Sequence, residues 1–65
     1  MTQFHVEFEI EDDGRWIADI TELPGVMAYG ASQEEAKAAA EALALRVLAD
    51  SIEQSKKAVA AVSFV

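Results

Sequence analysis

Apolar and polar side chains alternate along the first part of the chain. Apolar side chains stand at every second position from Phe4 to Ile10, with polar side chains between them. A period of two predicts a strand with one buried face and one solvent-facing side. The stretch from Arg15 to Thr21 alternates again, with apolar residues on one side: Trp16, Ala18 and Ile20. Two such stretches in succession favour a β-hairpin.

The sequence between these stretches, Asp12-Asp13-Gly14, predicts the turn of that hairpin. Gly14 can take the positive φ that hairpin loops need. A three-residue loop also sets the register. The expected opposite pairs are Glu11 with Arg15, Ile10 with Trp16, Phe8 with Ala18, and Val6 with Ile20. This register puts every large apolar residue of these pairs on one face, which supports it.

The rest of the chain predicts a third strand, a helix and a last strand. Leu23-Pro24-Gly25 should end the second strand, and Val26–Tyr29 should form the third. Ser32 fits the N-cap of a helix that runs to about Gln54 or Ser55, with Glu35 completing a capping box. Ala58–Val65 is apolar and predicts a strand buried in the sheet, parallel to an earlier strand.

These elements predict an α+β fold of order β-β-β-α-β, with a single mixed sheet and one helix on one face. Sixty-five residues make one domain, residues 1–65. The core of so short a chain is thin, and no cysteine is present to add a disulfide. The longest apolar stretch, Ala58–Val62, is too short to span a membrane, and no signal peptide is evident, so we expect a cytoplasmic protein.

The predicted helix carries two apolar stripes at helical spacing. The stripe expected to cover the sheet comprises Ala36, Ala40, Leu43 and Val47. The second stripe lies nearly opposite and comprises Ala38, Ala42, Leu45, Ala49 and Ile52. Its small residues would let another helix approach closely, so it predicts the interface of a homodimer or higher oligomer. The alternative is an alanine-rich face exposed to solvent, which Leu45 and Ile52 make less favourable.

Acidic residues gather in the first half of the chain. Seven acids face one base, Arg15, before residue 32, and this half carries −6 of the net charge of −7. An acidic surface repels phosphate backbones, so we expect no direct binding to nucleic acid. It attracts basic proteins. The alternative is that the acids serve only solubility.

The polar face of the predicted hairpin places Glu7 directly opposite Asp19, with Glu9 beside them. Like charges across a strand pair are destabilising. The repulsion could be offset by a basic partner, by plain solvation or by a divalent cation. The cation is the least favoured of the three, because no loop of converging ligands accompanies the acids. The residues expected to form or border a partner surface are Glu7, Glu9, Glu11, Asp19 and Tyr29.

No motif in the sequence indicates catalysis or a cofactor. His5 is the only histidine, and no nucleophile or orienting partner accompanies it, so an ordinary exposed strand residue is expected. Gly14, Gly25 and Gly30 are too dispersed to hold phosphate. Trp16 belongs to the inward face. We therefore expect a protein that is not an enzyme, with no cofactor and no metal.

Three ordered motifs resemble the HicB-like antitoxin family. They are Gly14–Ala18 (GRWIA), Glu22–Val26 (ELPGV) and Gly30–Ala36 (GASQEEA), and the likeness continues through Leu43–Asp50, so that it covers roughly residues 10–50. The resemblance implies a β-β-β-α-β core similar to a cut-down ribonuclease H fold. It also implies the antitoxin of a prokaryotic toxin–antitoxin pair.

The partner that this resemblance implies is a HicA-type toxin, a small basic protein that cleaves mRNA and that the antitoxin masks. Antitoxins of this family usually add a C-terminal DNA-binding module, and the chain to Val65 has no room for one. Two other functions stay open from the residues. One is an orphan interaction domain that forms homo-oligomers and binds another partner, and the other is a residual nuclease using Glu7, Glu9 and Asp19 with Mg²⁺.

Overall fold

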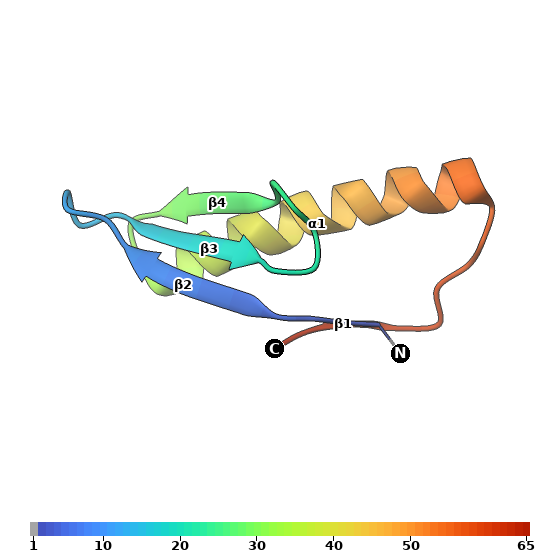
Figure 1. Cartoon of the computed structure of the whole chain (residues 1–65), viewed down its shortest axis with the longest axis horizontal. Helices are drawn as coiled ribbons and strands as arrows, with labels where there is room; N and C mark the ends of the chain where they lie inside the picture. Colours follow the sequence, from blue (N-terminus) through green and yellow to red (C-terminus); the bar gives the residue numbers. More distant parts are fainter. Residues whose placement is uncertain (1) are drawn as a thin grey trace.

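A computed structural model describes residues 2–65 as five strands and one helix (Figure 1). In chain order the elements are β1 (Thr2–Phe4), β2 (Val6–Ile10), β3 (Trp16–Ile20), β4 (Met27–Gly30), α1 (Gln33–Ser55) and β5 (Val62–Phe64). The predicted α+β class and mixed strand arrangement are confirmed, with the helix on one face of the strands.

The hairpin of β2 and β3 has the predicted register. Val6 lies opposite Ile20, Phe8 opposite Ala18, and Ile10 opposite Trp16. The loop closes through hydrogen bonds from the Glu11 N–H to the Arg15 carbonyl and from the Gly14 N–H to the Glu11 carbonyl, 2.7 and 2.9 Å long. Gly14 has φ of +89°, the left-handed conformation that favours glycine here.

The predicted first strand is divided in two at His5, and the predicted single sheet is divided with it. β1 pairs in parallel with β5, whereas β2 belongs to an antiparallel sheet of order β2-β3-β4. At the junction the Val65 N–H donates to the Phe4 carbonyl, and on the other side the Thr21 N–H donates to the His5 carbonyl. The Phe4 carbonyl thus faces the β5 side and the His5 carbonyl the β3 side, because the backbone groups of successive residues point to opposite edges of a strand.

Leu23-Pro24-Gly25-Val26 forms the tight turn between β3 and β4. The Val26 N–H donates to the Leu23 carbonyl at 3.0 Å, and Gly25 has φ of +85°. Proline followed by glycine with positive φ is the signature of a type II turn. The third strand begins one residue later than predicted, at Met27, because Val26 is still part of this turn.

The helix begins at the predicted cap. The Ser32 hydroxyl accepts a hydrogen bond from the Glu35 N–H at 3.1 Å. The Glu35 carboxylate reaches back to the N–H of Ala31, one residue before the serine that a capping box would use. The helix ends at Ser55, as predicted, and Lys56 closes it with φ of +58° and an N–H bond to the Ile52 carbonyl.

The helix lies very close to β3 and β4. Its fully buried residues are three alanines at four-residue spacing: Ala36, Ala40 and Ala44. A Cβ added at Gly30 would stand only 2.3 Å from the backbone nitrogen of Ala36. Glycine on the strand and alanine on the helix therefore allow an approach that larger residues would block. The rest of the buried core consists of Phe4, Ala18, Ile20 and Val26.

The predicted sheet-facing stripe is partly wrong. Ala36 and Ala40 are buried and Leu43 packs against the core, but Val47 is 39% exposed and Ala44 is buried instead. Residues four apart drift around a helix, so the contact line slants across it. Leu48, the next residue, still packs against the core, so the slanting contact line has passed from Ala44 to Leu48 and Val47 faces away from it.

The last strand is shorter than the predicted Ala58–Val65. β5 starts at Val62, and residues 58–61 are exposed and outside any strand. The long helix carries the chain beyond the sheet, so these residues are used to return to it (Figure 1). β5 is also half-buried at an edge rather than buried within the sheet. Phe64 stacks on Phe4 there, with ring centroids 5.8 Å apart.

Candidate binding face

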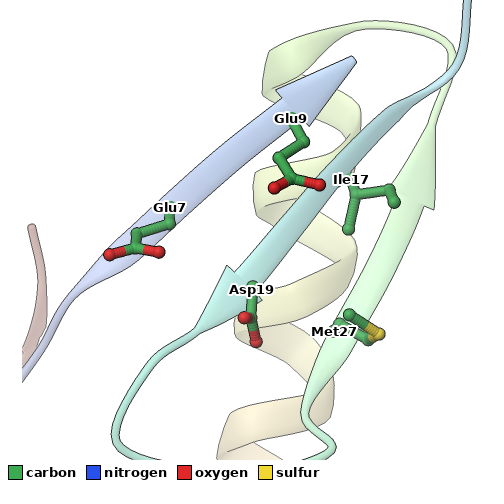
Figure 2. A pocket seen from close by; sticks show the side chains of 5 residues that line it. All are labelled: Glu7, Glu9, Ile17, Asp19 and Met27. Carbon is green, nitrogen blue, oxygen red and sulfur yellow. The ribbon is translucent and has the colours of Figure 1, made fainter. Parts of the chain in front are cut away.

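The face of β2, β3 and β4 that points away from α1, called the outer face below, holds a shallow hollow of about 260 Å³. Figure 2 shows five side chains around it, on the side opposite the helix. They are Glu7 and Glu9 from β2, Ile17 and Asp19 from β3, and Met27 from β4. The hollow combines acidic groups with an apolar floor, so it suits a side chain with an apolar stem and a cationic head.

The acids of this hollow are uncompensated. Glu7 lies directly opposite Asp19 in the ladder, as predicted, and Glu9 lies opposite Ile17. Within residues 2–65, no hydrogen bond or ion pair involves the carboxylates of Glu7, Glu9 or Asp19. Nothing in the described chain therefore offsets the repulsion between the two opposed acids.

Arg15, the base nearest in sequence to the acids of the hollow, does not pair with them. Arg15 forms an ion pair with Asp13, Nε to Oδ2, at 2.7 Å. Its guanidinium also lies 4.5 Å from the centre of the Tyr29 ring, a cation–π contact. The hydrogen bond from the Arg15 N–H is the main cause that lowers the pKa of Asp13. Arg15 thus holds the hairpin turn and leaves the acidic hollow uncovered.

Two predicted partner residues lie outside the hollow. Tyr29 is 47% exposed on β4 and lies opposite Ile17, two residues along from Met27 and on the same face. Glu11 follows β2 and closes the hairpin loop through its backbone. The structure therefore brings Glu7, Glu9 and Asp19 together, places Tyr29 beside them, and sets Glu11 apart at the turn.

Sequence reasoning missed the apolar part of this face. Ile17 is only 9% exposed although it points away from the core, and Met27 is 44% exposed beside it. A signal was present, because the alternation that puts Trp16 inward puts Ile17 outward. Extending the register by one strand would have placed Met27 and Tyr29 on the same side.

His5 is also more than an ordinary strand residue. Its backbone N–H donates to Glu22 Oε1 at 2.8 Å, and its ring Nδ1 lies 2.5 Å from Glu22 Oε2. Thr21 adds a hydroxyl bond to the same carboxylate. These donors, led by the His5 backbone N–H, lower the pKa of Glu22 from 4.5 to about 2. The pair ties the turn after β3 to the residue where the first strand changes partners.

We expect this contact to make stability depend on acid pH. A carboxyl group whose pKa is lower in the folded state stabilises that state above its unfolded pKa, near 4.5. The contribution is lost as pH falls from there towards 2. Glu22→Gln should therefore melt at a lower temperature than the parent at pH 7, and the gap should close at pH 2.

Calorimetry across this pH range would check the expectation. Glu53→Gln is the matched control, because it removes an exposed carboxylate that has no hydrogen bond within the described chain. A melting-temperature gap for Glu22→Gln that is the same at pH 7 and pH 2 would contradict the proposed role of the Glu22 carboxylate.

The second helical stripe is largely open to solvent. Leu45 is 49% exposed, and Ile52 is half-buried. The three alanines of the stripe are exposed as well: Ala38, Ala42 and Ala49. The face predicted to meet a second copy is therefore accessible, with Ile52 turned partly towards the protein.

Residues 2–65 contain no group of three histidine, cysteine, aspartate or glutamate side chains placed to hold a metal ion. No helix in this part of the chain is long and apolar enough to cross a membrane.

Comparisons with protein-family models, with curated proteins and with solved structures found no match.

Proposed function

We propose that this domain is an antitoxin-like module that binds a small basic protein and neutralises it by masking its surface. The partner class follows from the resemblance to HicB-like antitoxins, namely a HicA-type toxin that cleaves mRNA. The cell compartment of such a pair would be the cytoplasm.

The observation that carries the proposal is the pairing of Glu7 with Asp19 over an apolar floor. Folding gains nothing from two opposed carboxylates, because like charges across strands are destabilising. A cation from a partner would relieve the repulsion and add an attraction. Ile17 and Met27 would contact the apolar stem of the same side chain. A basic protein surface would supply both the cation and the apolar contact.

A metal-dependent nuclease is less favoured by the same geometry. Glu7, Glu9 and Asp19 come from one hairpin, whereas a two-metal site needs acids from several elements around ions about 4 Å apart. An orphan domain with a different basic partner would use the same outer face, so the identity of the partner needs a direct test.

We expect the gene beside the one for this chain to encode a short basic protein, and the test is co-expression of the two. Expression of the neighbour alone should stop growth, and co-expression with this domain should restore it. Purified together, the two proteins should form a complex that protects RNA from cleavage. Failure of this domain either to bind the neighbour or to restore growth would refute the toxin-masking proposal.

The double variant Glu7→Gln with Asp19→Asn should slow association with the basic partner by about three- to tenfold at low salt, because it removes charges that steer the encounter. The isolated domain should be at least as stable as the parent, since the repulsion across the strands is also removed. Stopped-flow binding at several salt concentrations and urea unfolding would measure the two effects.

The matched control is Glu34→Gln with Glu53→Gln, which changes the net charge equally but on the helix. It should leave association closer to that of the parent. Equal rates for both double variants, without any dependence on salt, would place the interface away from the outer face.

We also propose that two copies associate through the second helical stripe, because it leaves Leu45 half exposed. Leu45→Glu should raise the dimer dissociation constant by at least about tenfold, since burial of a leucine contributes about 1.5–3 kcal/mol. Ala39→Glu, on another exposed side of the helix, is the control. Light scattering that shows the parent as a monomer at high micromolar concentration would contradict the proposal.

A further inference from the structure

The backbone of β2 has one edge that is only partly paired. The Glu11 N–H bonds to the Arg15 carbonyl, and the Thr21 N–H bonds to the His5 carbonyl. Bonded pairs alternate in an antiparallel ladder, so the backbone groups of Glu7 and Glu9 also face β3. Those of the intervening residues, Phe8 and Ile10, must then point away from it.

β5 covers only the beginning of this outward edge. The Val65 N–H donates to the Phe4 carbonyl, and the Val65 carbonyl accepts from the Val6 N–H, each at 2.8 Å. Beyond Val6, no hydrogen bond within residues 2–65 reaches the outward backbone groups of Phe8 or Ile10. The sheet thus presents a free edge of β2, defined here by Phe8 and Ile10, in line with β5 (Figure 1).

The two sides of this edge differ in chemistry. On the outer face stand Glu7 and Glu9, which have no ion pair in the described chain. On the helix side, Ile10 is 61% exposed and Phe8 is half-buried. A strand laid against the edge would therefore meet carboxylates at one set of alternate positions and uncovered apolar side chains at the other.

We propose that the free edge of β2 accepts an extended segment of a basic protein, in which cationic and apolar side chains alternate. The backbone of the segment would satisfy the groups of Phe8 and Ile10, as in other cases of strand addition. Its lysine or arginine side chains would face Glu7 and Glu9, and its apolar side chains would cover Ile10. This mode of binding rests on the proposed function and specifies how the basic partner is held.

A second copy of the chain fits this edge poorly. Antiparallel pairing of β2 with β2 would set the glutamates of one copy against those of the other, which is destabilising. Each copy also carries a net charge of −7. The charge of the edge therefore selects a cationic strand over self-association.

The probe for this proposal is an acetylated eight-residue peptide of alternating lysine and valine, titrated into the isotope-labelled chain. The amide signals of Phe8 and Ile10 should shift, and these amides should become protected from solvent exchange. A peptide of alternating glutamate and valine has the same pattern with the charge reversed, and it should not bind.

Backbone pairing is tested by Ile10→Pro against Ile10→Ala. Both variants remove an exposed side chain, but only proline removes the outward N–H, and edge strands tolerate proline at such positions. The proline variant should weaken peptide binding by at least about tenfold relative to the alanine variant, because it loses a backbone hydrogen bond and blocks close approach.

Two N-methylated peptides keep the proposal testable should Ile10→Pro unfold. Methylation of the valine amides should abolish binding to the parent chain if the added strand is antiparallel, and methylation of the lysine amides should do so if it is parallel. One of the two peptides should therefore lose binding, and the other should keep it.

The other outcomes overturn the inference and separate it from the proposed function. Binding that survives both methylations and shifts Asp19 and Met27 would show a peptide lying on the outer face without adding a strand, and the basic-partner proposal would stand. A parent chain that dimerises, with Ile10→Pro abolishing the dimer, would make the edge an interface between copies. No binding at millimolar peptide would refute strand addition while leaving growth rescue by the full-length partner as the separate test.

Discussion

Gly30→Ala is expected to destabilise the domain by about 3 kcal/mol, at the upper end of the cost of overpacking a core. The added Cβ would lie 2.3 Å from the Ala36 nitrogen and 2.8 Å from the Glu35 carbonyl carbon. Both are backbone atoms of the first helical turn, so no side chain can rotate away. The helix would have to move off β4, and the buried alanines would lose contact with the strands.

The melting temperature should fall by roughly 15 °C, given the usual relation between stability and melting for domains of this size. Thermal unfolding followed by circular dichroism would measure it. Gly25→Ala is the comparison, because a Cβ there meets no atom within 4 Å but the residue has φ of +85°. Its cost should be about 1 kcal/mol and come from backbone conformation alone.

Whether Gly30→Ala raises or lowers the melting temperature tests the close approach of the helix to β4. The φ of Gly30 lies outside the left-handed region, so without the close helix an alanine would stabilise the strand by about 0.5–1 kcal/mol through its lower chain entropy. A melting temperature that rises in Gly30→Ala would show that the helix does not approach β4 as described.

Ile20→Ala should cost about 3–4 kcal/mol, which is a large part of the stability of a small domain. Among residues 2–65, Ile20 is the largest side chain that is fully buried, and it packs among the alanines of α1 and Phe4. A thin core has few neighbours that can move in to fill the cavity, so most of the loss should remain.

Ile17→Ala is the matched variant on the same strand. Ile17 is nearly as buried as Ile20, but it lies on the outer face beside Glu9 and Asp19, where water can enter the space left by truncation. Its cost should be smaller, about 1–2 kcal/mol. Urea unfolding of both variants would compare them, and equal losses would mean that the outer face is as closed as the core.

The elements that repeated periodicity specifies could be predicted from the sequence. Alternation and a three-residue loop were sufficient for the register of β2 and β3, and Ser32 with Glu35 marked the start of the helix. The length of the last strand could not be predicted in this way. An apolar run such as Ala58–Val62 fits a strand equally well whether it pairs or only returns the chain from the end of a long helix.

In the candidate site, too, only the features that follow from periodicity could be predicted. The opposition of Glu7 and Asp19 follows from register alone, and the structure has it. The contact of His5 with Glu22 depends on how the turn after β3 folds back, which no period in the sequence describes. The choice of Ala44 over Val47 depends on the angle at which the helix crosses the strands, a tertiary property.

The parallel pairing of β1 with β5 has a consequence for the order of folding. It joins Thr2 to Val62, so it closes a loop of nearly the whole chain. The contacts among the other strands and α1 join residues that are closer in sequence. Loop closure costs more entropy as the loop lengthens, and distant contacts form late. The two chain ends should therefore dock after the hairpin and helix have formed, and Phe4 and Phe64 should separate first when the domain opens.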